Sequence, residues 1–281
     1  MKRPVDQYGS FAEVYDEWQM LYPRAFSIAL APRIVAAVKE HGPPRPVLAD
    51  VACGTGIFAL WWQRTHRSWN VYGLDGSPAM IDVAKKEARR MAAGRGRRAD
   101  GAAGRTGGRG GKAARAPVFV VQDMRRLELP EPAGVVTCLF DSLNHLTRST
   151  DLARTFRGVA RALAPGGLFL FDFIDELAFP EVYRGSSIFD GPGLFVGMDT
   201  EYHEERGAGI GTARFTFFKK QREGWRRLEF DIRERRWYRG QIRELLTAAG
   251  LDLLGLQKID PYESDEFFVP RTFWICRRRA R

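Results

Sequence analysis

An acid and a glycine turn stand side by side near the start of the chain. Residues Val47 to Gly56 read V-L-A-D-V-A-C-G-T-G, an apolar run that holds Asp50 and ends in glycines before the apolar stretch Ile57 to Trp62. Such a turn offers backbone N–H groups and a helix N-terminus to a ligand that approaches the main chain closely. Because Asp50 would repel a bare pyrophosphate, the pattern favours a ligand with a cationic or hydroxyl-bearing end.

The elements that would position this turn alternate between strand and helix, as in an α/β domain. Apolar runs predict five strands, Val47–Val51, Asn70–Leu74, Val118–Gln122, Val135–Phe140 and Leu168–Phe173, the last preceded by a turn A-P-G-G. Helical periodicity predicts helices over Val14–Glu40, in two pieces broken near Pro23 and Pro32, and over Ile57–Thr65, Pro78–Met91 and Asp151–Leu163. Strands joined by such crossovers form a mostly parallel, doubly wound sheet.

The pattern changes between Ile188 and Tyr238, where apolar and polar residues alternate between glycine-rich breaks. This alternation predicts antiparallel strands, and hence a separate small sheet set on the core. The chain then returns to a helix, Gln241–Ala249, stopped by Gly250, and to two strands, Asp252–Ile259 and the run T-F-W-I-C. We therefore expect an N-terminal helical segment (residues 1–46), a core (47–173 and 237–281) and an antiparallel insertion (174–236).

The net charge of +10 is concentrated in two segments. Residues 92–117, which we call the basic insert, contain seven basic residues and one acid, and four arginines lie in the last five residues. The rest of the chain is formally neutral, so no basic groove built into the fold is indicated. The basic insert consists almost entirely of Gly, Ala and Arg, which predicts a disordered loop; the alternative is an RNA-binding segment, although aromatic residues for stacking are absent from it.

Other composition features exclude several classes of protein. No apolar run approaches the ~20 residues that span a bilayer, and the N-terminus lacks the apolar stretch of a signal peptide, so we expect a cytoplasmic protein with no membrane partner. The three cysteines, Cys53, Cys138 and Cys276, are widely spaced. They indicate neither a disulfide framework nor a metal site.

The turn G-T-G-I-F-A also fits the dinucleotide pattern G-x-G-x-x-A, with Asp75 about twenty residues further on. Four features distinguish this chain from a dinucleotide-binding protein. They are Asp50 before the turn, Q-D-M at the end of the third strand, F-D-S-L at the end of the fourth, and L-A-P-G-G-L before the fifth. Together these motifs resemble the class I S-adenosylmethionine-dependent methyltransferase family over about Tyr8 to Phe173, with Gln241 to Cys276 fitting its closing elements. The resemblance implies a Rossmann-like α/β fold with a seven-stranded sheet.

The same resemblance implies which residues bind S-adenosylmethionine. Asp50 and the backbone from Ala52 to Gly56 would hold its methionine end, although the family often has glycine where this chain has Ala52. Asp75 would accept both ribose hydroxyls, and Asp123 the adenine amino group; a lone acid after a strand is, however, often a turn former. The implied cofactor-binding residues are Asp50, Ala52, Cys53, Gly54, Gly56, Asp75, Gly76, Met80, Asp123, Met124, Phe140 and Asp141.

Two residues are candidates for catalysis. His145, in D-S-L-N-H-L, follows the fourth strand and would be the base if the acceptor arrives protonated; alternatively it only packs at a helix start. The segment Y-G-S-F-A-E-V-Y-D resembles the lid of small-molecule members of the family, so Tyr15 would donate a hydrogen bond to cofactor or substrate. Phe11, Tyr15 and Trp18 at helical spacing are equally typical of core packing.

These motifs predict a methyltransferase that acts on nitrogen or oxygen of a small molecule and resembles amino-sugar and small-amine N-methyltransferases. The alternatives are an RNA or protein methyltransferase anchored by the basic insert, and an S-adenosylmethionine- or NAD-binding protein without catalysis. Against a nucleic-acid partner, the fourth strand ends in F-D-S-L-N and not in an N-P-P-Y type of sequence. The sequence does not name the acceptor, and we expect a monomer or homodimer.

Overall fold

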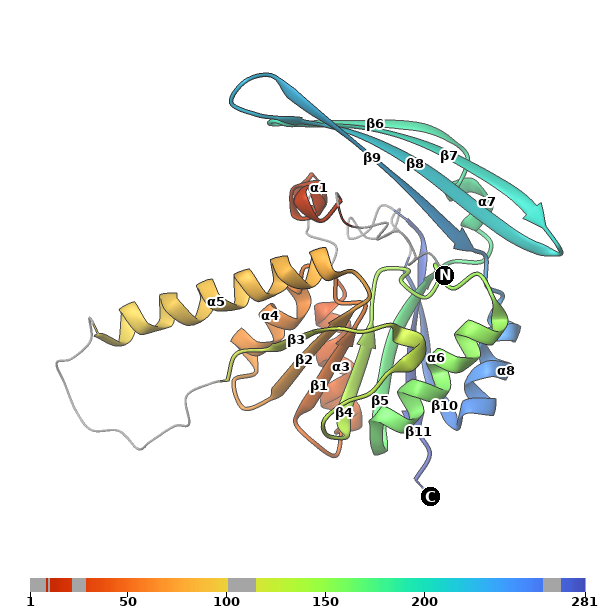
Figure 1. The fold of residues 1–281 in the computed structure, drawn as a ribbon. Helices are drawn as coiled ribbons and strands as arrows, with labels where there is room; N and C mark the ends of the chain where they lie inside the picture. Colours follow the sequence, from red (N-terminus) through yellow and green to blue (C-terminus); the bar gives the residue numbers. More distant parts are fainter. Residues whose placement is uncertain (1–8, 10, 22–28, 101–114, 260–268, 281) are drawn as a thin grey trace.

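The computed structural model describes residue 9 and residues 11–21, 29–100, 115–259 and 269–280, and for 94–100 it describes only the backbone. Two sheets dominate this part of the chain (Figure 1). One has seven strands in the order β10-β11-β5-β4-β1-β2-β3, and the other has four in the order β6-β7-β8-β9. The predicted α/β fold with an antiparallel insertion is therefore confirmed.

The seven-stranded sheet is parallel from β5 to β3, whereas β11 runs antiparallel to both of its neighbours. Its central strands are buried along their whole length because helices cover both faces. Five strands follow the predicted ones closely, and two close the sheet. They are β1 (Val47–Val51), β2 (Asn70–Asp75), β3 (Val118–Val121), β4 (Ala133–Cys138), β5 (Leu163–Ile174), β10 (Leu251–Ile259) and β11 (Arg271–Arg278).

Two sets of helices sandwich this sheet. Buried side chains of α3 (Ala31–His41), α4 (Ile57–Thr65) and α5 (Pro78–Asp100) pack on one face. Those of α6 (Ser149–Ala162) and α8 (Arg239–Ala249) pack on the other. Gly250 ends α8 in the left-handed conformation, with φ +79°, as a glycine at a helix C-terminus commonly does.

Two local predictions were wrong. Helix α5 continues through Asp100, whereas we expected the basic insert to leave the helix at residue 92. Arginine and alanine are good helix formers, so an existing helix is extended by them in spite of the glycines. The A-P-G-G segment lies inside β5, where the register shifts between Ala133 and Val135, and is not a turn before the strand. The remainder of the insert, 101–114, lies outside the described residues.

The four-stranded sheet, which we call the roof, lies over the carboxyl ends of the parallel strands (Figure 1). Its strands are β6 (Gly185–Gly191), β7 (Leu194–Glu205), β8 (Ala208–Lys220) and β9 (Trp225–Arg235), and short α7 (Phe179–Val182) leads into it. Phe11 of η1 (Phe11–Glu13) stacks on Phe230 of the roof at 4.4 Å between ring centroids. Trp18 of α1 (Tyr15–Met20) packs against Phe215 and Phe217. η1 and α1 are thus held between the roof and the core, where Asp16 of α1 accepts a hydrogen bond from the Thr55 hydroxyl at 2.6 Å.

No helix in the described ranges is both long and apolar enough to cross a membrane.

Candidate active site

The glycine turn after β1 is shaped by three left-handed residues. Ala52, Gly54 and Gly56 have φ values of +56°, +56° and +81°. Gly56 is the N-cap residue directly before α4, and a Cβ added there would come within 2.7 Å of the Phe119 ring. Ala52 adopts a conformation that usually requires glycine, so this departure from the family pattern is accommodated at the cost of some backbone strain.

Asp75 is fixed at the edge of this turn. One of its carboxylate oxygens accepts a hydrogen bond from the Gly54 N–H at 2.9 Å, and the other accepts one from the Ser77 N–H at 2.8 Å. Ser77 in turn accepts a hydrogen bond from the Met80 N–H at 3.4 Å, as a residue that caps α5 does. Since each carboxylate oxygen can accept more than one hydrogen bond, a carboxylate in this position is chemically suited to a pair of hydroxyls.

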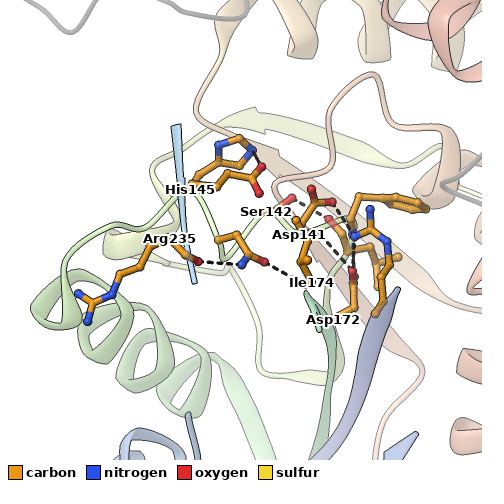
Figure 2. Close-up of polar contacts among 11 residues, drawn as sticks. Asp141, Ser142, His145, Asp172, Ile174 and Arg235 are labelled. Atoms are coloured by element: carbon orange, nitrogen blue, oxygen red, sulfur yellow. Dashed lines mark hydrogen bonds and ion pairs between the residues drawn. The ribbon is translucent and has the colours of Figure 1, made fainter. Parts of the chain in front are cut away.

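A second tight turn follows β4. Phe140 and Asp141 have φ values of +59° and +48°, which are unusual for non-glycine residues in succession. The buried Asp172 of β5 holds the turn, because its two oxygens accept hydrogen bonds from the Phe140 N–H at 2.7 Å and the Asp141 N–H at 3.1 Å (Figure 2). The strain is therefore compensated by charged hydrogen bonds.

Arg271 of β11 completes this arrangement. Its guanidinium donates to Asp141 at 2.6 Å and to Asp172 at 2.8 Å, and it lies 5.5 Å from the centre of the Phe140 ring. Burial alone lowers the pKa of Arg271, but the two carboxylates outweigh burial and raise it, so Arg271 is a permanent cation. Burial raises the pKa of Asp172, and Arg271 opposes that rise.

Sequence reasoning missed both Asp172 and Arg271. A signal for Asp172 was present, because it is the one charge in the otherwise apolar strand L-F-L-F-D-F-I. A charge in a strand buried on both faces requires a partner. Nothing comparable marks Arg271, which is one of many arginines in the chain.

The roof reaches the same region through Glu234 on β9. Its fully buried carboxylate lies 3.1 Å from Nε2 of His145. Asn144 fixes this contact: its side-chain amide donates to the Arg235 carbonyl at 2.9 Å, and its side-chain oxygen accepts from the Ile174 N–H at 3.2 Å (Figure 2). Burial lowers the pKa of His145, more than Asp141 raises it, so the imidazole is neutral near pH 7.

A cavity of about 1560 Å³ lies between the roof, η1, α1 and the core. Typical ligand pockets measure roughly 300–1000 Å³, so this cavity has room for two small molecules together. Most of the predicted site residues line it: Tyr15, Ala52, Gly54, Asp75, Gly76, Met80, Met124, Phe140, Asp141 and His145.

Four predicted residues do not line the cavity: Asp50, Cys53, Gly56 and Asp123. Asp50 is buried beneath the glycine turn, where it accepts a 2.7 Å hydrogen bond from the Thr137 hydroxyl, and burial raises its pKa to about 7. Asp123 accepts from the Arg125 N–H and forms an ion pair with the Arg125 guanidinium at 2.5 Å. The turn-forming alternative thus describes Asp123 in this structure, and its contact with adenine stays a prediction.

Tyr15 of α1 lies against the glycine turn and lines the cavity, and its role as a lid residue stays a prediction. Its ring lies 3.5 Å from where a Cβ on Gly54 would be, and it packs edge-on against Phe11 at 5.2 Å. Burial, and then the nearby carboxylates Asp141 and Asp75, raise the pKa of its phenol. Tyr15 therefore remains a hydrogen-bond donor throughout the physiological range. In the described residues no cluster of potential metal ligands exists.

Comparisons with known proteins agree with this geometry. A family model described as a methyltransferase domain matches residues 49–171. The dTDP-4-amino-2,3,4,6-tetradeoxy-D-glucose N,N-dimethyltransferase of Saccharopolyspora spinosa is 28% identical over 195 residues, which cover 69% of this chain and 62% of that protein. The dTDP-3-amino-3,6-dideoxy-alpha-D-glucopyranose N,N-dimethyltransferase of Streptomyces fradiae is 26% identical over 179 residues, 63% of this chain and 57% of that protein. The matches thus span about three fifths of these relatives' lengths.

Solved structures extend the similarity to the roof. An S-adenosylmethionine-dependent methyltransferase from Clostridium acetobutylicum ATCC 824 superposes with a TM-score of 0.74 at 21% identity, covering 97% of this chain and 99% of that one. CalS10, an amino pentose methyltransferase from Micromonospora echinaspora, gives 0.62 at 19% identity, with 94% and 96% covered. The methyltransferase-domain model thus matches the part of the chain that holds the glycine turn and Asp75, and the solved structures share the fold over nearly the whole chain.

Proposed function

We propose that the protein transfers the methyl group of S-adenosylmethionine to an amine nitrogen of a small-molecule acceptor. One observation carries the proposal: a single cavity joins the glycine turn and Asp75 on one wall to Asp141 and His145 on another. The first wall has donors and acceptors suited to a nucleoside with a charged amino-acid end, and the second suits the reacting groups. Two ligands that meet in one cavity react as an aligned pair.

The residues of the first wall fit the cofactor. The Asp75 carboxylate is chemically suited to the ribose hydroxyls, and a Cβ on the neighbouring Gly76 would meet nothing within 4 Å, so the main chain there is open to a ligand. Met124 and Tyr15 would flank the bound molecule. When bound, S-adenosylmethionine supplies an electrophilic methyl group on a cationic sulfur.

The chain itself would align the reactants and exclude water. Phe140 and Asp141 are set by Asp172 and Arg271, so the wall next to the reacting atoms is rigid. The roof and N-terminal segment contribute apolar side chains such as Phe11, Met198, Phe215 and Phe230. An amine reacts only in its neutral form, because a protonated amine has no free lone pair. A water-poor site favours this neutral form over the charged one.

The nature of the acceptor is supported by the relatives. Two curated relatives are named as N,N-dimethyltransferases of amino sugars carried on dTDP, and a solved neighbour as an amino pentose methyltransferase. The cavity has the volume for such an acceptor beside the cofactor, and His145 is a neutral imidazole that lines it. We therefore infer an amino sugar or similar amine as the acceptor class.

Calorimetric titration with S-adenosylhomocysteine tests the cofactor half of the proposal. Asp75→Ala removes charged hydrogen bonds worth about 1.5–3 kcal/mol, so we expect roughly 10- to 150-fold weaker binding. Asp82→Ala, an exposed acid on the same α5 helix, is the matched control and should leave affinity unchanged. Binding of NAD without any response to S-adenosylhomocysteine would overturn the proposal.

Methyl transfer itself is tested with methyl-labelled S-adenosylmethionine against a panel of amines, sugars and phenols. We expect label in amines, with the highest rates for amino sugars. Tight cofactor binding with no labelled product from any member would favour the alternative of a binding protein without catalysis.

A further inference from the structure

Glu234 is a buried acid that the fold alone does not explain. Its side chain lines the cavity, is 0% exposed, and comes from strand β9 of the roof. Neither carboxylate oxygen has a hydrogen bond of good geometry within the described residues, and the polar groups that face it are the Tyr183 phenol, the Asp141 carboxyl group and Nε2 of His145. Buried polar atoms almost always have such partners, and a buried acid without one is costly, so a role is expected.

The charges around Glu234 leave an excess of negative charge. Asp141 faces it from the turn after β4, Tyr183 from the end of α7, and His145 lies 3.1 Å away. Arg271 of β11 is the nearby permanent cation, but its guanidinium is committed to Asp141 and Asp172. The acids at this site are Asp141, Asp172 and Glu234. Because His145 is neutral, the fixed cation among these described groups is Arg271. Such a site attracts a cation.

We propose that Glu234 is the charge partner of the acceptor's ammonium nitrogen and accepts its proton before methyl transfer. This inference rests on the proposed function, because it assigns a residue to the acceptor side of that reaction. The inference goes beyond the proposed function because it gives a residue of the roof a chemical role at the reacting nitrogen.

The proposed step balances in atoms and electrons. An N–H bond of the ammonium breaks, its electron pair stays on nitrogen, and the proton goes to a Glu234 oxygen. The nitrogen lone pair then forms the new C–N bond to the methyl carbon as the C–S bond breaks, and that bonding pair stays on the now neutral sulfur. His145, with a side chain 30% exposed, lies next to Glu234 and would pass the proton toward solvent.

The ionisation of Glu234 agrees with this role. Burial, and then repulsion from Asp141, raise the pKa of Glu234 well above its usual range. The same surroundings raise the pKa of Tyr183, chiefly through burial and then through Glu234, so Tyr183 stays a neutral phenol. A carboxyl held in this way is ionised by an arriving cation and is ready to take a proton back.

The position of Glu234 also separates it from cofactor binding. It lies outside the matched methyltransferase domain of residues 49–171, on the strand that Asn144 ties to the end of β5. The wall that holds Asp75 is contributed by β1, β2 and the turns after them. A substitution at Glu234 should therefore change acceptor recognition and leave cofactor recognition intact.

The experiment uses the protein saturated with S-adenosylhomocysteine and two probes of matched shape, cyclohexylamine and cyclohexanol. We expect the parent to bind the amine on the order of a hundredfold more tightly than the alcohol, and Glu234→Gln to abolish this preference. Glu229→Gln, an exposed acid on the same strand paired with Arg227, is the matched control and should keep it. Equal binding of both probes by the parent, or a preference that survives in Glu234→Gln, overturns the inference.

A second measurement needs no variant. Because a bound ammonium would favour the ionised form of Glu234, binding of cyclohexylamine should release protons within a pH series from 5 to 9, measured by calorimetry in buffers of different ionisation enthalpy. No proton release, or release that persists in a folded Glu234→Gln protein, contradicts the role. The outcomes are distinct from failure of the proposed function, which loss of S-adenosylhomocysteine binding by the parent would reveal.

Discussion

The two walls of the cavity are built in different ways. We call the wall formed by the glycine turn and Asp75 the cofactor wall. Its residues Gly54, Asp75 and Ser77 lie within one β-turn-α-β-turn-α segment, and their hydrogen bonds join backbone to side chain over short distances in sequence. We call the wall that holds Asp141 and His145 the acceptor wall. There Glu234 contacts His145, 89 positions away in the sequence, and Arg271 contacts Asp141, 130 positions away.

This difference indicates how such a fold changes its substrate. The cofactor wall depends on the local geometry of a strand, a glycine turn and a helix, which leaves few residue choices. The acceptor wall is assembled from the roof, α7 and β11, so its side chains can be exchanged without altering that geometry.

The strongest way to break the comparison is Arg271→Met, because Arg271 holds the turn at Phe140 and Asp141 on the acceptor wall. Removal leaves the buried Asp172 and the partly buried Asp141 without their cation, so we expect a loss of about 3–5 kcal/mol in the free energy of unfolding, measured with urea.

The matched control for this variant is Arg279→Met, which breaks the half-exposed pair with Asp252 and should cost no more than about 1 kcal/mol. Similar losses in the two variants would show that the buried network contributes no more than a surface ion pair.

Asp50→Asn sharpens the account of the cofactor wall through its pH dependence. The pKa of Asp50 is raised by burial from 3.8 to about 7, so between those values the unfolded chain loses this proton before the folded protein does. The parent's stability therefore falls as pH rises through this window, by up to about 4 kcal/mol from this group, and is constant above it.

This loss should be absent in Asp50→Asn. The difference in unfolding free energy between the variant and the parent should therefore rise between pH 4 and 7, and the variant should be the more stable protein at pH 8. The measurement is urea unfolding at a series of pH values. Parallel curves for the two proteins would mean that Asp50 is ionised at its ordinary pKa.

The smallest effect is expected from the basic insert. Changing Arg105, Arg109 and Lys112 to glutamine should leave cofactor affinity and transfer to small amines within about twofold, because none of the insert's described residues lines the cavity and salt weakens charge effects that act at a distance. Both quantities are measured with the calorimetric and labelled-methyl assays. A large loss of activity, or salt-dependent RNA binding that these changes remove, would favour a macromolecular acceptor.

Sequence patterns located most elements because strands and helices were marked by local signals. Val47–Val51 and Ile57–Thr65 were predicted with their observed bounds, since each is an apolar run ended by a turn signal. The end of α5 was predicted wrongly, because residues 92–100 are compatible with both helix and loop, and the preceding helix decides between them.

The sequence by itself determined the fold class and the placement of Asp75 and indicated the type of cofactor, because the glycine turn and the acids at successive strand ends are fixed by local backbone geometry. Only the tertiary structure decided that Asp50 lies beneath the turn, that Arg271 and Asp172 hold the second turn, and that Glu234 closes the cavity from the roof. The physical reason is that these contacts join segments brought together by the sheet crossovers and the inserted roof, and a contact between distant strands leaves no periodic signal in either segment.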